Sequence, residues 1–66
     1  MSYNEYVNAV KTNFKKLKSN LTETEVNNYF SESETIDELK EGYEVYSRNN
    51  KIGHPMSKAS NLVMMY

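Results

Sequence analysis

Apolar side chains recur every three or four residues along this chain, and this spacing constrains the fold more than any other feature. In the first segment they fall within about 100° of arc on a helical wheel, as expected for a helix with one buried stripe. The residues concerned are Tyr3, Tyr6, Val7, Val10, Phe14 and Leu17. The alternation typical of a strand occurs only weakly, around residues 43–46. The pattern predicts an all-α fold.

Capping residues mark where the helices should begin. Four pairs have the Ser/Thr-x-x-Glu spacing of a capping box, in which each side chain accepts a hydrogen bond from the other residue's backbone N–H: Ser2–Glu5, Thr22–Glu25, Ser31–Glu34 and Thr35–Glu38. The last two compete, so the start of the third helix is ambiguous by one turn. Residues 49–55 break the pattern. We expect a single domain over 1–66, a bundle of three to four short helices at about 3–18, 23–30, 34–48 and 56–65.

A chain of 66 residues without cysteine has neither a disulfide nor a thiolate zinc site to stabilise it. Six tyrosines supply much of its apolar surface, which predicts a shallow core with the hydroxyl groups at its rim. Gly42 falls in the middle of the third predicted helix and costs about 1 kcal/mol relative to alanine. A close crossing of two helices is the favoured explanation.

The longest uninterrupted apolar run, Leu62–Tyr66, is far too short to cross a bilayer. The first twenty residues are rich in charged and amide side chains, unlike a signal peptide. These features predict a cytoplasmic protein that does not act at a membrane. Asn and Lys are abundant while residues with G/C-rich codons are scarce, so we expect a bacterial or phage origin.

Catalytic machinery is sparse. The only histidine, His54, cannot form a metal site by itself, and no second imidazole is present. A hydrolase using His54 as the base and Ser57 as the nucleophile is an alternative, but a turn residue between Gly53 and Pro55 is favoured. We expect no enzymatic activity and no cofactor or metal.

Charge is strongly segregated along the chain. Residues 1–20 carry a formal net charge of +3, residues 21–46 carry −7 and residues 47–66 carry +3. The first predicted helix has a ridge of lysines at positions 11, 15 and 18. The third has a ridge of acids, Glu34, Asp37, Glu41 and Glu44. Four arrangements stay open: the ridges pair between these two helices, they are simply solvated, they pair between two chains, or the acids face a basic partner.

Direct binding to nucleic acid is not expected, because phosphates would repel the acidic third helix where a helix–turn–helix protein reads DNA. Val45 and Met64 should be exposed, since each lies opposite its helix's apolar stripe. The sequence thus predicts a non-enzymatic interaction protein that acts through its surface, either on a protein partner or as a homodimer. The alternative is a regulator or inhibitor that binds a nucleic-acid-handling protein through the acidic helix 34–44. The candidate partner-binding residues are Glu34, Asp37, Glu41, Glu44, Val45 and Met64.

Overall fold

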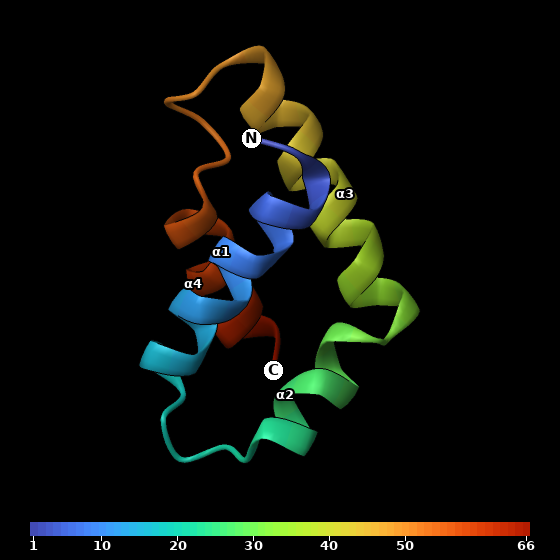
Figure 1. The fold of residues 1–66 in the computed structure, drawn as a ribbon, viewed down its shortest axis with the longest axis vertical. Helices are drawn as coiled ribbons and strands as arrows, with labels where there is room; N and C mark the ends of the chain where they lie inside the picture. The colour runs from blue at the N-terminus through green and yellow to red at the C-terminus, as the bar shows by residue number, and fades with distance from the viewer.

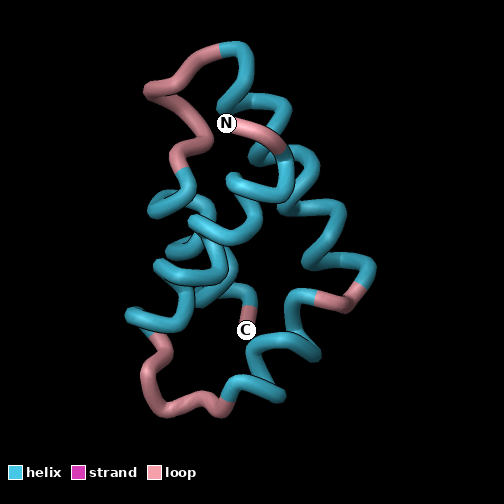
Figure 2. The backbone as a smooth tube through the Cα atoms, viewed as in Figure 1, coloured by secondary structure: helices cyan, strands magenta, loops and turns pink.

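Four helices make up the fold in the computed structural model, which describes all 66 residues (Figure 1). They are α1 (Tyr3–Leu17), α2 (Glu23–Phe30), α3 (Ser33–Arg48) and α4 (Pro55–Met65). No strand is present, and short loops join the helices (Figure 2). The predicted all-α bundle is confirmed, with helix ends within one residue of expectation. None of the helices combines the length and the apolar character needed to cross a membrane.

Capping boxes start α1 and α2, as predicted. The Ser2 backbone N–H donates to Glu5 Oε1 at 2.7 Å, and the Glu5 N–H donates to Ser2 Oγ at 3.2 Å. Thr22 and Glu25 repeat this exchange at 2.9 and 3.2 Å. The hydrogen bonds that each glutamate accepts lower the pKa of Glu5 and of Glu25 below the usual carboxyl value. Local sequence alone therefore fixes these two helix starts.

The start of α3 differs from both predicted capping boxes. The helix begins at Ser33, with Glu32 at the N-cap and no side chain capping it. Ser31 is not available, because its hydroxyl donates to the carbonyl of Asn27 at 2.7 Å and so completes the end of α2. Thr35 is buried inside the first turn of α3. Packing against the rest of the molecule overrides the local capping preference here.

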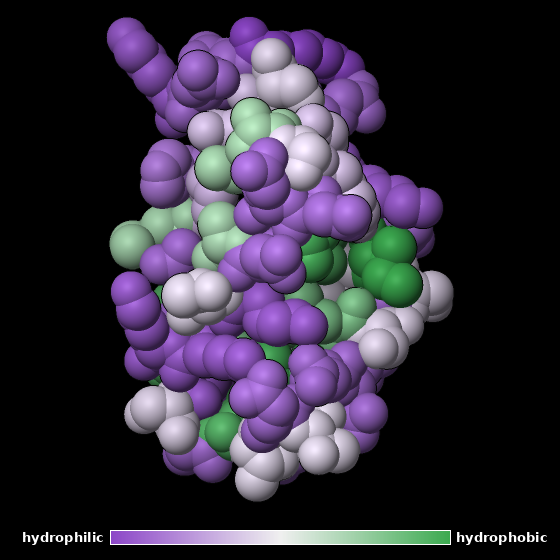
Figure 3. Space-filling view, in the orientation of Figure 1, coloured by the Kyte–Doolittle hydropathy of each residue, from purple (hydrophilic) through white to green (hydrophobic).

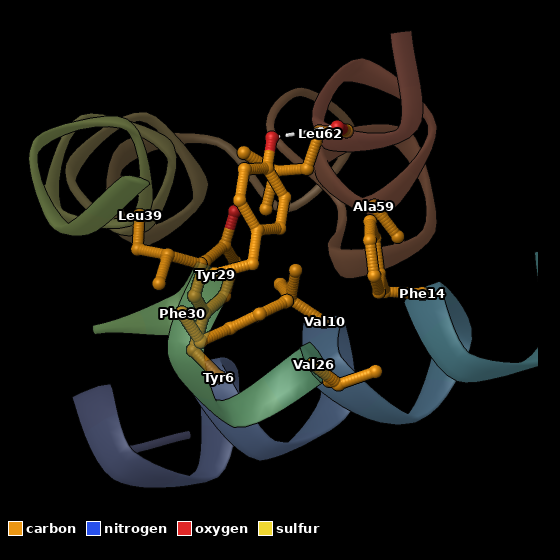
Figure 4. Close-up of a cluster of buried hydrophobic side chains, with 9 residues drawn as sticks. All are labelled: Tyr6, Val10, Phe14, Val26, Tyr29, Phe30, Leu39, Ala59 and Leu62. Carbon is orange, nitrogen blue, oxygen red and sulfur yellow. Dashed lines mark hydrogen bonds between the residues drawn. The ribbon is translucent and has the colours of Figure 1, made fainter. Parts of the chain in front are cut away.

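The core lies where α1 and α4, which run side by side, meet α2 and α3 (Figure 1). Nine buried apolar residues converge there, as Figure 4 shows: Tyr6, Val10, Phe14, Val26, Tyr29, Phe30, Leu39, Ala59 and Leu62. Ala59 has no accessible surface, and its small side chain suits the close approach of α1 and α4. Leu17 was expected in the α1 stripe but is 52% exposed, because α1 ends at this residue and the core ends at Phe14.

Two tyrosine hydroxyls are deeper than the predicted rim position. The Tyr29 hydroxyl donates to the Leu62 carbonyl at 2.7 Å inside the core (Figure 4). The Tyr6 hydroxyl donates to the Gly53 carbonyl at 2.8 Å. Burial raises the pKa of Tyr6 to about 12. Each hydroxyl satisfies its hydrogen-bonding need at a backbone carbonyl, so these rings pack inside the protein without a lone polar atom.

Three helices come together at Gly42, which confirms the predicted close crossing. A Cβ at this position would lie 2.5 Å from the Tyr6 hydroxyl oxygen of α1 and 2.6 Å from Lys58 Cε of α4. The Lys58 ammonium passes Gly42 and donates to Glu38 Oε1 at 3.1 Å. The absence of a side chain at Gly42 therefore makes room for an ion pair between α4 and α3.

Candidate interaction surface

No pocket opens on the surface, and no three His, Cys, Asp or Glu side chains lie together as ligands for a metal ion. The face shown in Figure 3 is mostly hydrophilic, with small separate apolar regions. What the surface does carry is a segregated set of charges and several exposed apolar side chains. The candidate residues among them lie on two helices, α3 and α4.

A row of carboxylates runs along the outer side of α3. We call it the α3 acidic face, and it consists of Glu34, Asp37, Glu41 and Glu44, all exposed. The buried residues of α3 are Thr35, Leu39 and Gly42. Asp37, Glu41 and Glu44 each lie two positions from a buried residue, which is about 200° around an α-helix. The acidic face therefore points away from the core along about 15 Å of helix, at 1.5 Å per residue.

Most of this face forms no ion pair. The protein contains three ion pairs: Lys15–Glu23, Arg48–Glu44 and Lys58–Glu38. Glu44 is thus paired within its own helix, one turn from Arg48. Glu34, Asp37 and Glu41 take part in none of the three pairs. Their charge is exposed to solvent and to any molecule that approaches α3.

Two lysines of the α1 ridge, Lys11 and Lys15, contact α2, so of the arrangements left open the pairing of α1 with α3 within one chain is wrong. Lys11 donates to Asn27 Oδ1 at 3.0 Å, and its ammonium lies 5.5 Å from the centre of the Phe30 ring. Lys15 binds Glu23 at 2.7 Å, which lowers the pKa of that carboxyl. The Lys18 ammonium sits 5.4 Å from the ring centre of Tyr66.

Aromatic rings, not charges, join α1 to α3. Tyr3 and Tyr6 both meet the Tyr43 ring edge-on, with ring centres 5.6 and 5.5 Å apart, and Tyr6 also contacts Tyr46. The helical wheel shows which face of α1 carries the lysines but not which helix packs beside that face. Because α2 packs there, Lys11 and Lys15 contact α2 and not α3.

Val45 does not have the exposure predicted for it. It is half-buried, because the segment after α3 folds back along this helix. A Cβ at Gly53 would lie only 3.3 Å from Val45 Cβ and 2.8 Å from the Gly42 carbonyl oxygen. Gly53 also has a φ of 74°, a backbone conformation that favours glycine. Val45 therefore serves the packing of this loop.

Met64 is 85% exposed, as predicted, and lies on a different helix from the α3 acidic face. It is two positions from buried Leu62, so it points outward from α4. Other apolar side chains of α4 and the residue after it are also about half exposed: Met56, Met65 and Tyr66. We call these four residues the α4 apolar residues. The predicted site is thus two separate features, one acidic and one apolar.

His54 caps α4. Its Nδ1 accepts a hydrogen bond from the backbone N–H of Met56 at 3.2 Å, and Pro55 occupies the first helical position. The hydrogen bonds of His54 do not include one to Ser57. The sequence analysis correctly favoured His54 as a turn residue but did not predict this capping hydrogen bond. The His-Pro pair directly before the apolar period of α4 is the sequence signal for it.

Lys58 is a nearly buried charged residue that the sequence analysis did not single out. Its side chain is only 8% exposed, whereas that of its partner Glu38 is 35% exposed. The wheel position of Lys58, next to Ala59 and four residues before Leu62, does place it on the core side of α4. What the sequence could not provide is the partner, because Glu38 is 20 residues away on another helix.

Comparisons with protein-family models, with curated proteins and with solved structures gave no match to this chain. Function is therefore argued from the chemistry of the two surface features.

Proposed function

We propose that this chain is a non-enzymatic interaction protein whose α3 acidic face binds a basic surface of a protein partner. The observation that carries the proposal is that Glu34, Asp37 and Glu41, although exposed, take part in none of the ion pairs of the molecule. The lysines expected to neutralise them are held by α2 and by an aromatic ring. Pairing of the two ridges between copies of the chain would first have to break those contacts. A basic partner would not.

The acidic face also carries an energetic cost. Like charges three or four residues apart on a helix destabilise it by about 0.2–0.5 kcal/mol per pair. The face contains three such pairs: Glu34–Asp37, Asp37–Glu41 and Glu41–Glu44. A cost without an internal compensation is expected where residues serve a function other than folding. A cationic surface that approached the row would offset this repulsion by attracting each carboxylate.

The partner class that fits best is a protein with a nucleic-acid-binding surface. Such surfaces are clusters of lysine and arginine that bind a row of phosphate charges. A regular row of carboxylates on a rigid helix presents the same sign of charge along one line. The chain would then act as a regulator or inhibitor that occupies this surface.

The test is affinity capture from a lysate of the source organism with two variants that share a net charge. The neutralised variant carries Glu34→Gln, Asp37→Asn and Glu41→Gln, which raise the formal net charge from −1 to +2. Asn8→Lys, Thr12→Lys and Ser60→Lys reach the same +2 at exposed positions of α1 and α4, with the acidic face intact. We expect a basic protein to be retained by the wild type and by the lysine variant and to be lost by the neutralised variant.

High salt should weaken this capture, because exposed charges more than about 10 Å apart are largely screened at 0.1 M ionic strength. Equal capture by both variants would contradict the proposal. So would loss with both variants, since that result would follow net charge, and so would loss with the lysine variant alone, since that result would follow the altered faces of α1 and α4.

Self-association is the second candidate function, and the α4 apolar residues favour it. Methionines are adaptable in shape and suit protein interfaces. A small helical domain with a thin core also commonly gains stability by oligomerising. Light scattering over a concentration series tests this, with Met64→Lys as the variant expected to abolish a dimer. A particle of 7.7 kDa at every concentration and salt would refute it.

A further inference from the structure

His54 is the only side chain that caps α4, and it does so through a nitrogen that must be unprotonated. The 3.2 Å hydrogen bond runs from the Met56 backbone N–H to Nδ1. Nδ1 of a neutral imidazole accepts a hydrogen bond only when the proton of the ring is on Nε2. In the imidazolium both nitrogens are donors. The capping bond therefore exists in one protonation state of His54.

Protonation would oppose the helix in two ways. An Nδ1–H would face the Met56 N–H, so two donors would meet and the amide would lose its acceptor. A positive charge would also stand at the N-terminus of α4, where the helix dipole already carries partial positive charge. Histidine is the side chain whose charge ordinarily changes between pH 5 and 8.

The surroundings of His54 contain no group that would hold the proton. The ring meets the Tyr46 ring of α3 edge-on, with centres 6.4 Å apart. On the α1 side, Tyr6 donates to the carbonyl of Gly53, and its raised pKa of about 12 keeps it neutral. No carboxylate lies within ion-pair distance of the imidazole. Lys58, one turn further along α4, directs its ammonium to Glu38.

We propose that His54 is a pH-sensitive cap, which closes the first turn of α4 when neutral and releases it when protonated. The first turn of α4 continues from the 49–54 loop, which packs on Val45 and holds the Tyr6 hydroxyl at Gly53. Release of the cap would therefore loosen the contact of this loop with α1 and α3. Neutral His54 closes the first turn and protonated His54 does not, so we expect the protein to be less stable at pH 5.5 than at pH 7.5.

Thermal unfolding at pH 7.5 and pH 5.5, followed by circular dichroism at equal ionic strength, tests this. His54→Asn keeps a side-chain oxygen for the cap but does not titrate in this range, and His54→Ala has no cap at either pH. The carboxylates whose pKa is lowered, Glu5, Glu23 and Glu25, stay ionised throughout the window. The difference between wild type and variants thus isolates His54.

The wild type is expected to lose about 4–8 °C more in Tm than His54→Asn between the two pH values, the shift typical of one lost cap in a domain of this size. At both pH values the Tm of His54→Ala should lie below that of His54→Asn by the same amount as the Tm of the wild type does at pH 5.5. Equal pH dependence of all three proteins would overturn the proposal. If His54→Asn has the same Tm as His54→Ala at pH 7.5, asparagine does not cap the helix. The wild type is then compared with His54→Ala, and equal losses of Tm between the two pH values would overturn the proposal.

An NMR titration gives a second readout at the capping bond. The Met56 amide resonance of the wild type should shift with the His54 ring as pH falls, and its hydrogen-exchange protection should drop. A Met56 amide that does not respond while the His54 ring titrates would also overturn the proposal.

Discussion

At Gly42 the hydroxyl of Tyr6 and the side chain of Lys58 fill the space that a Cβ would occupy. Lys58 is flexible, but the Tyr6 ring is fully buried and its hydroxyl is bound to Gly53. An added methyl group must therefore displace a fixed ring as well as a movable chain. The glycine is explained by this crowding, in spite of the helix propensity it sacrifices.

Gly42→Ala should lower the free energy of unfolding by up to about 2 kcal/mol, because overpacking costs about 1–3 kcal/mol and the helix-propensity gain offsets only about 1 kcal/mol of it. Urea unfolding measures this. Ser47→Ala, at an exposed position of the same helix, is the control and should change stability by about 0.5 kcal/mol or less. A stabilised Gly42→Ala variant would show that the crossing is loosely packed.

The Glu38–Lys58 pair should respond unequally to removal of its two partners. Glu38→Ala leaves a nearly buried ammonium without an acceptor, which we expect to cost about 1–3 kcal/mol. This is less than the 3–5 kcal/mol for breaking a fully buried pair, since Glu38 is partly solvated. Lys58→Met removes the buried charge and leaves Glu38 hydrated, so its cost should be smaller. Urea unfolding that ranked the two variants in the opposite order would contradict this account of the pair.

Among the helices, α2 depends most on its cap, because it has only eight residues. Thr22→Ala removes the hydrogen bond from the Glu25 N–H and should destabilise the protein by about 1 kcal/mol. Glu32→Ala is the matched control at the N-cap of α3, where no side-chain cap is formed, and should have little effect. The two variants are compared by thermal unfolding. Equal losses of Tm would mean that the α2 capping box contributes nothing specific.

The same caps predict how stability depends on acid. The pKa of Glu25 is lowered in the folded state, mainly by the hydrogen bond from the Thr22 backbone. The stabilisation from such a carboxylate is present above pH 4.5, the ordinary value, and is lost as pH falls through the lower, folded pKa. Glu25→Gln should therefore flatten the acid side of the stability profile below pH 4.5. An unchanged slope would contradict the assignment.

Sequence reasoning succeeds where the signal is local and fails where a distant residue decides. Ser2 and Thr22 start their helices through residues three positions away, so the helical wheel and the capping rule were sufficient. The start of α3 was not predictable, because Ser31 is used by the end of α2 and Thr35 is buried by other helices. The same limit explains Val45, which is covered by the loop at Gly53, eight residues later.

The candidate site shows this limit for the whole molecule. The wheel grouped the four acids of α3 into one ridge beside the apolar stripe, and all four are exposed in the structure. It could not tell that α2, rather than α3, would take the α1 lysines. That choice depends on how the helices pack, and it leaves Glu34, Asp37 and Glu41 outside the three ion pairs of the molecule.

The account rests on the claim that the α3 acidic face does not contribute to folding and is free for a partner. The free energy of unfolding of the Asp37→Asn, Glu41→Gln double variant measures this. The variant removes all three like-charge pairs and leaves Glu34, near the helix N-terminus, and the Glu44–Arg48 pair in place. We predict a gain of about 0.6–1.5 kcal/mol, from about 0.2–0.5 kcal/mol for each of the three repulsive pairs. A loss of stability would contradict the claim, since it would mean that these carboxylates hold the fold together.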